Sequence, residues 1–369
     1  MRVTQVSRRW LVPAAAVAVI GAGAAVAPAV AGASPDLPGI TAQQLLANVQ
    51  TAKVDGLSGT VKVSSDLGLP ALPDGMGPRQ SQLTDLLSGD HTVRVAYAAP
   101  DKARVSVLDN MSERVLVTDG TTAWAYDSHA HTATKKSIAP HMQHSARPET
   151  AQDPQTLAKQ FLDAVDPTTK VTVTGTRSVA GQDAYLLRLT PKTDRTTVGS
   201  VTIAVDAKNW MPLRTTVMPR SGGKPAIDVG FTDVSFATPA ASTFAFTPPP
   251  GTKVTDNGTD QGTEMAPPNR PVPKPNGTRP PQRNLGGTPP TVIGTGWDAV
   301  AVTHFNADAT SNGMLRQLLA KAPSVSGSWG TGRVVSSRMV TALITDDGRL
   351  MIGLVPQSVL EQAAAKAPR

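Results

Sequence analysis

The stretch "VLVTDGTTAWAY" (residues 115–126) predicts an antiparallel β-hairpin. Asp119-Gly120 is a strong signal for a two-residue type I′ turn, because both central residues of that turn need a positive φ, which Asp-Gly tolerates. Two valines alternate before the turn, and Trp124 and Tyr126 share one face of the strand after it. Only 4% of the chain is aromatic, so the surface that this pair faces is the first question.

Alternating apolar strands dominate the chain as far as residue 247, and helices are few. Five strands are expected within residues 91–138 and five more within residues 170–236. Helices are expected over residues 41–54, which Thr41 can cap, and over residues 153–166, with Pro154 in the first turn. This pattern predicts a mainly β domain with an α lid, built as one large curved antiparallel sheet or open barrel.

The composition changes after residue 247. Residues 248–290 are rich in proline and poor in large apolar residues, which predicts an extended disordered linker, with a solvated tether as the preferred interpretation of its basic residues. Residues 291–369 predict a small α+β domain. It has a hairpin of buried strands in "SRMVTALITDDGRLMIGLVP" and helices in "SNGMLRQLLAKA" and "QSVLEQAAAKA". Residues 34–247 form the expected large domain.

The first 33 residues resemble an export signal peptide. Arg2, Arg8 and Arg9 precede an Ala/Val-rich segment, and "AVAGAS" offers cleavage after Ala31 or Ala33. "SRRWLV" is loosely similar to a twin-arginine signal, and an uncleaved anchor is the alternative. We therefore expect an exported, extracytoplasmic protein of the cell envelope or a secreted one.

Cysteine is absent, so neither a disulfide nor a thiolate metal site can form, and no lipid can be attached to a cysteine after the signal peptide. The formal net charge is +7. Three of these cations lie in the signal segment and the rest are dispersed, so the charge gives no argument for nucleic-acid binding.

Three motifs together resemble the superfamily of LolA, LolB and RseB. "VLVTDGTTAWAYDSHAHTATK" is similar to the aromatic hairpin of the lipoprotein carrier LolA, and "FAFTPPPGTKV" (residues 244–254) to the end of its sheet. "VDAKNWMPLR" (residues 205–214) is similar to a turn found across the wider group. The resemblance covers about residues 37–254, and the order of helices and strands also agrees.

The resemblance implies a half-open, incomplete β-barrel whose helices cover an apolar cavity. It implies a non-enzymatic protein that binds lipid or lipoprotein acyl chains as a carrier or a sensor. One departure concerns the carrier function. Ala99 precedes Pro100 where LolA has an arginine tied to lipoprotein handling, so the pocket is expected without that switch.

The resemblance to RseB gives the alternative function. RseB joins a LolA-like domain to a smaller C-terminal domain, senses acyl chains and restrains an anti-sigma factor. A negative regulator of an extracytoplasmic-function sigma factor is therefore the second hypothesis. Its expected partner is a membrane anti-sigma factor, whereas a carrier would have a transporter as partner. A wall-associated adaptor acting through the basic linker is the third.

The cavity is expected to be lined by apolar side chains without catalytic groups. The strand candidates are Val93, Val95, Val105, Val107, Val115, Val117, Trp124, Tyr126, Leu187, Leu189, Val201 and Ile203, and the helix candidates are Leu45, Leu46, Val49 and Phe161. The alternate set that faces inward is not fixed by the sequence, because a register shift of one residue moves every side chain to the other face. All of them can equally be ordinary core residues.

Signals for enzymatic or metal chemistry are weak. The sequence lacks a G-x-S-x-G elbow, a P-loop and an H-E-x-x-H motif, and "SGGK" (residues 221–224) matches S-x-x-K only in a Gly-rich turn. His129 and His131 would share a face if they lay on a strand, with His141 and His144 nearby. No carboxylate lies between these histidines, so we expect no metal site. Because the enzyme motifs are also absent, we expect no cofactor and no enzymatic activity.

Overall fold

The computed structural model describes residues 34–68, 89–109, 112–138, 168–256, 291–304 and 322–367. The predicted signal peptide, the helix expected over residues 153–166 and the helix expected in "SNGMLRQLLAKA" lie outside these ranges, as does most of the predicted linker. None of the helices within the described ranges is both long and apolar enough to cross a bilayer.

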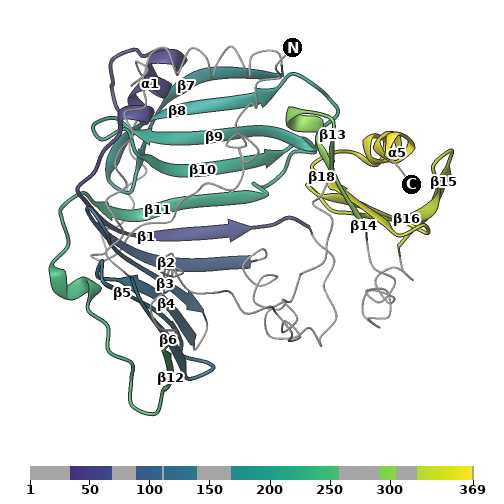
Figure 1. Ribbon diagram of the computed structural model, residues 1–369. Helices are drawn as coiled ribbons and strands as arrows, with labels where there is room; N and C mark the ends of the chain where they lie inside the picture. Colours follow the sequence, from purple (N-terminus) through teal and green to yellow (C-terminus); the bar gives the residue numbers. More distant parts are fainter. Residues whose placement is uncertain are drawn as a thin grey trace, which may run out of the picture.

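A twelve-stranded sheet forms the large unit (Figure 1). Its strand order is β12-β6-β5-β4-β3-β2-β1-β11-β10-β9-β8-β7, and its neighbours are antiparallel except β12 and β6. The bounds are β1 (Gly56–Ser65), β2 (Gly89–Ala98), β3 (Lys102–Asp109), β4 (Ser112–Thr118), β5 (Thr122–Asp127), β6 (Thr132–Ser137), β7 (Thr169–Val179), β8 (Gln182–Pro191), β9 (Val198–Asp206), β10 (Pro212–Pro219), β11 (Ile227–Ser235) and β12 (Lys253–Asp256). The sheet is strongly curved and its end strands β12 and β7 do not pair, so the predicted half-open architecture is confirmed.

Helix α1 (Ala42–Thr51) begins where the sequence predicted. The Thr41 side chain accepts a hydrogen bond from the Gln44 backbone N–H, and the Gln44 side chain accepts one from the Thr41 backbone N–H. This reciprocal pair is a capping box, which satisfies amide groups that have no partner inside the helix. Leu45 is fully buried and directs α1 onto the sheet.

The turn at Asp119-Gly120 differs from the predicted type I′ turn. Gly120 has φ 96°, but Asp119 has no positive φ, and the strands first pair at Thr118 and Ala123. The Asp119 carboxylate accepts hydrogen bonds from the backbone N–H groups of Thr121 and Thr122, both at 2.8 Å. These bonds stabilise a longer loop, because an Asp side chain can replace a backbone acceptor in a turn.

The large sheet extends beyond the expected end of the domain. β12 pairs in parallel with β6, with Lys253 opposite Thr132 and Asp256 opposite Lys135. Residues 253–256, which the sequence placed in the linker, are therefore part of the sheet. The parallel partner strand was not predictable from local pattern, because β12 is short and all four of its residues are exposed.

Among its described residues, the C-terminal module has a six-stranded sheet, an α-helix and a short 3₁₀ helix, as its α+β pattern predicted. The order is β13 (Thr291–Ile293), β14 (Val300–His304), β18 (Arg349–Gly353), β17 (Thr341–Thr345), β16 (Gly330–Ser336) and β15 (Ser324–Gly327), with α5 (Gln357–Lys366) and the short 3₁₀ helix η3 (Gly296–Asp298). The hairpin of β17 and β18 was predicted, whereas β15 and β16 were not. Leu343, Met351 and Leu360 are buried where α5 packs against this sheet.

Arg349 fixes the end of α5 to the sheet of the C-terminal module. Its side chain is 1% exposed and donates to the backbone carbonyls of Ala364 (3.1 Å) and Trp329 (3.1 Å). It also forms an ion pair with Asp347, with 2.7 Å between Nη2 and Oδ2. The hydrogen bond from Arg349 lowers the pKa of Asp347 below its ordinary value. A cation at a helix C-terminus also interacts favourably with the helix dipole.

The C-terminal module is docked against the ends of β9, β10 and β11 (Figure 1). Thr196, which is fully buried, donates from its hydroxyl to the Leu354 carbonyl at 2.7 Å, and the Thr197 backbone N–H donates to the same carbonyl at 2.9 Å. Met339 of the module is 1% exposed and clusters with Val198 of β9. The two units therefore share both a core and backbone hydrogen bonds.

Arg338 completes this interface from the module side. Its guanidinium donates to the Asp66 carboxylate (2.5 Å) and to the Lys224 carbonyl (2.6 Å), and its backbone N–H donates to the Leu67 carbonyl (3.0 Å). One side chain thereby links the end of β1 to the loop before β11. On the opposite side of the interface, Trp297 Nε1 donates to Thr169 Oγ1 at 2.6 Å.

Arg349→Met should destabilise the C-terminal module by about 3 kcal/mol, because the carbonyls that Arg349 satisfies lose their donor and remain buried. Urea unfolding followed by tryptophan fluorescence measures this change. Arg94→Met, at an exposed position of β2, is the matched control and should stay within about 0.5 kcal/mol of the parent. Equal stability of the two variants would contradict the anchoring role.

Candidate functional site

The large sheet has two faces, and α1 identifies one of them, which we call the inner face. Leu45 of α1 packs in one cluster with Tyr185, Leu187 and Val205. The Tyr185 hydroxyl donates to the Pro38 carbonyl at 3.0 Å, so the segment before α1 is held on the same face. Side chains on this face can be followed across the sheet, because directly opposed residues of paired strands point to the same side.

The inner face carries two apolar clusters, one under α1 and one around Val95. Leu187 of β8 lies opposite Ile203 of β9. Across β10, the same face continues to Val229 of β11, which lies opposite Val63 of β1. Val63 belongs to the second cluster, which is centred on the fully buried Val95. The predicted cavity residues on this face are Leu45, Leu46, Val49, Val93, Val95, Val105, Val107, Leu187, Leu189, Val201 and Ile203.

Four predicted cavity residues lie on the opposite, outer face: Val115, Val117, Trp124 and Tyr126. Val105 pairs with Leu116 rather than with a valine of β4, so Leu116 shares the inner face and its neighbours point away from it. Phe161 lies outside the described residues. The strand pattern alone could not separate these sets, because both alternate sets of β4 and β5 contain apolar residues.

Trp124 and Tyr126 face a strap, which we define as residues 236–252 between β11 and β12. The strap contains the short 3₁₀ helix η2 (Ala241–Phe244). Phe246 of the strap lies between the two rings, with its ring centroid 5.7 Å from that of Trp124 and 5.6 Å from that of Tyr126. Phe244 is 2% exposed in the same cluster. The aromatic pair therefore belongs to a core between the sheet and the strap.

A groove of about 310 Å³ lies on the inner face over β3 to β6. Its floor consists of small side chains on neighbouring strands, Ala103, Ala123 and Ala125, and Leu116 stands beside them with 59% of its surface exposed. The remaining lining residues are Val105, Val117, Thr118, Trp124, Thr134 and Lys136. An exposed leucine beside three alanines makes an apolar depression with one cation at its edge. The sequence predicted only Val105 among the inner-face residues that line the groove. The alanines were missed because alanine carries little hydrophobic signal, and Leu116 was missed because Val115 and Val117, on the alternate set of β4, were selected instead.

A charged cluster lies on the inner face at the other end of these strands. Asp109 accepts a hydrogen bond from Arg114 Nη2 at 2.7 Å, and its Oδ1 lies 3.0 Å from His91 Nδ1. Burial raises the pKa of Asp109, but the hydrogen bonds from Arg114 and His91 outweigh it and leave the pKa below its ordinary value. Asp109 therefore stays ionised at neutral pH, and the groove is bordered by charge at this end.

The two histidines that the sequence analysis weighed as a weak candidate for metal binding do not lie on a strand. His129 and His131 lie in the turn between β5 and β6 rather than on a strand, and His131 has φ 48°. Within the described ranges, no three His, Asp or Glu side chains are placed to hold a metal ion. His141 and His144 lie outside those ranges.

A comparison with protein families matches part of the large unit. The model of the family described as outer membrane lipoprotein carrier protein LolA matches residues 93–247. This range begins in β2 and contains the groove and the outer-face aromatic cluster, but none of the C-terminal module. The predicted resemblance to the LolA-like superfamily is confirmed over this range.

Solved structures with similar folds have low sequence identity. The Pseudomonas aeruginosa MucA/MucB complex is 15% identical, covering 87% of this chain and 94% of that chain, with a TM-score of 0.41. A LolA superfamily protein from Nitrosomonas europaea is 13% identical, covering 56% and 99%, with a TM-score of 0.22. At these values the likenesses carry no functional argument. No curated protein matches the chain.

Trp124→Ala should lower the free energy of unfolding by about 2–3 kcal/mol, somewhat below the cost for a fully buried tryptophan, because the ring is partly buried against the strap. Leu116→Ala, one strand away on the inner face, should change it by less than about 0.5 kcal/mol, because Leu116 is exposed. Urea unfolding measures both. A larger loss of unfolding free energy in Leu116→Ala than in Trp124→Ala would contradict the assignment of the two faces.

Proposed function

We propose, on the premise that residues 93–247 form a LolA-like domain, that the protein binds an acyl chain of a lipid or lipoprotein in the groove on its inner face. It acts outside the cytoplasm, as a carrier or a sensor, and without catalysis. The observation that carries this proposal is the groove itself, with its alanine floor and its exposed Leu116.

The size of the groove suits a single alkyl chain. A cavity of roughly 150 Å³ holds a benzene molecule of six carbons, so a groove of about 310 Å³ has space for roughly a dozen carbons. It lies at the lower end of the range of roughly 300–1,000 Å³ that is typical of ligand pockets. The expected ligand segment is therefore one chain rather than several side by side.

The hydrophobic effect supplies the affinity. Each buried methylene contributes about 0.8 kcal/mol, so ten of them give about 8 kcal/mol before the costs of association. The groove is open, which lets a chain enter from its side without rearrangement of the sheet. Lys136 at its edge adds positive charge, which favours a ligand with an anionic head group.

A regulator that acts through protein contact is the second candidate. The C-terminal module exposes an apolar row on the face of its sheet opposite α5: Val292 is 45% exposed and Ile352 is 41% exposed, and Ala301 lies between them in register. Adjacent exposed apolar side chains are typical of interaction surfaces. The expected partner is the extracytoplasmic part of a membrane anti-sigma factor, and the exposed apolar row supports this candidate as a contact surface.

Ala125→Trp should weaken acyl-chain binding at least about tenfold, because the indole fills the groove floor. Displacement of a fluorescent fatty acid from the purified mature chain measures the change, and native mass spectrometry reports any ligand that co-purifies. Ala125 is exposed in the groove, so the fold should be retained.

Ala130→Trp places the same ring in the exposed turn between β5 and β6 and should bind like the parent. If the parent chain binds neither fatty acids nor lipopeptides, the acyl-binding function is wrong. If Ala125→Trp and Ala130→Trp bind equally well, the ligand lies elsewhere.

Ile352→Asp tests the regulator. Cross-linking in cells followed by mass spectrometry should recover a membrane anti-sigma factor with the parent, and about tenfold less of it with Ile352→Asp, because a charge then interrupts the apolar row. Val254→Asp, at a 49% exposed position of β12, is the matched control and should behave like the parent. Failure of the parent to recover such a protein would rule out this function.

A further inference from the structure

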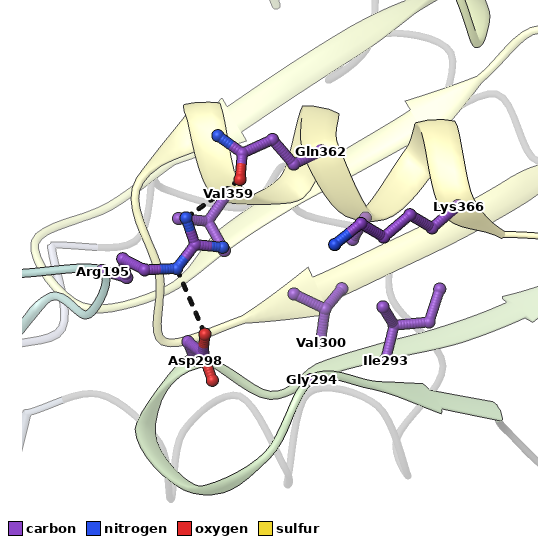
Figure 2. Close-up of a pocket in the computed structure, with 9 residues that line it drawn as sticks. Arg195, Ile293, Gly294, Asp298, Val300, Val359, Gln362 and Lys366 are labelled. Carbon is purple, nitrogen blue, oxygen red and sulfur yellow. Dashed lines mark hydrogen bonds and ion pairs between the residues drawn. The ribbon is translucent and has the colours of Figure 1, made fainter. Parts of the chain in front are cut away.

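A second, smaller pocket lies between the large sheet and the C-terminal module (Figure 2). Its volume is about 80 Å³. Arg195 reaches it from the connection between β8 and β9, Asp298 from η3, and Gln362 and Lys366 from α5. Two cations and one anion line the pocket, so it carries one uncompensated positive charge.

Arg195 is held in place by two hydrogen bonds. Its Nε donates to Asp298 Oδ2 at 3.2 Å, and its Nη1 donates to Gln362 Oε1 at 2.9 Å. Both contacts cross from the large sheet to the C-terminal module. Within the described residues, the second terminal nitrogen, Nη2, has no hydrogen-bond partner, and because the guanidinium is planar its direction is set by the other two nitrogens.

Lys366 approaches the same space from the other end of the pocket. Figure 2 shows its amine directed toward the side of the pocket where the Arg195 guanidinium lies. No hydrogen bond or ion pair to Lys366 occurs among the residues that the structure describes. The pocket thus presents two donor groups without partners, one fixed and one on a flexible stem.

The wall between the two cations is apolar. Val300, Val359 and Ile293 line it, and Val300 is 1% exposed. A water molecule occupies roughly 30 Å³ in the liquid, so about 80 Å³ holds the equivalent of roughly two to three waters. That is enough for an anionic group on a short stem, and too little for the acyl chain assigned to the groove.

The net charge of the pocket favours a carboxylate over a phosphate dianion. Bidentate binding of a carboxylate or a phosphate uses two adjacent nitrogens of one guanidinium. Here Nε and Nη1 already donate to Asp298 and Gln362, so Nη2 is the nitrogen left for a ligand. A carboxylate has two oxygens, one for Arg195 Nη2 and one for the Lys366 amine. Its single negative charge also neutralises the single excess positive charge, whereas a dianion would overcompensate it.

We propose that this pocket binds one carboxylate group with a short apolar stem, either a free short-chain acid or a glutamate side chain of a bound peptide. The bound carboxylate joins Arg195 of the large unit to Lys366 of the C-terminal module and so strengthens their docking. The site is separate from the groove, and its occupation does not depend on acyl-chain binding.

Methyl NMR of the intact mature chain tests the site, with butyrate and N-acetylglutamate amide as separate probes for its two sources. Each probe should shift the methyl signals of Val300, Val359 and Ile293 in a saturable manner, and inorganic phosphate and chloride at matched ionic strength should not. Lys366→Gln should weaken the response at least tenfold. Lys208→Gln, an exposed lysine at the distant turn between β9 and β10, should leave it unchanged.

A response to butyrate alone assigns the site to small acids, and a stronger response to the glutamate probe assigns it to an acidic peptide. Shifts that follow ionic strength whatever the anion, or that persist in full in Lys366→Gln, would overturn the proposal, as would the absence of any shift. Acyl-chain binding by the groove is measured independently, so either result leaves the proposed function to its own test.

Discussion

The register of the paired strands in the twelve-stranded sheet is the constraint on which the rest of the structure depends. Side chains alternate along each strand, and opposed residues share a face, so the pairing of Val105 with Leu116 decides the orientation of every residue in β4 and β5. A shift of one residue in this pairing would turn the Trp124 side chain to the inner face and the Leu116 side chain to the outer face, under the strap. The groove and the aromatic core are therefore two consequences of the same pairing.

Each face of the sheet has its own apolar cover. α1 covers part of the inner face through Leu45, and the strap covers the outer face through Phe244 and Phe246. The strap then adds β12 beside β6, which fixes its end to the sheet edge. Because the outer face is filled in this way, the open apolar groove lies on the inner face, where small side chains leave space.

The C-terminal module is attached at the ends of the strands rather than on either face. Buried hydrogen bonds from Thr196 and Thr197, together with the contacts of Arg338, fix it beside β9, β10 and β11. The groove lies toward the other end of its strands, near the Asp119 loop. The groove and the exposed apolar row of the module are therefore separate surfaces of one body.

The sequence by itself determined most elements of the large sheet, the start of α1 and the hairpin of β17 and β18, because hydrophobic periodicity and capping are local properties. It also indicated a LolA-like domain. Only the tertiary structure decided which alternate side chains face inward, that residues 253–256 join the sheet, and that Arg195 and Lys366 border one pocket. These features depend on pairings between residues far apart in the chain, and local pattern contains no information about register between distant strands.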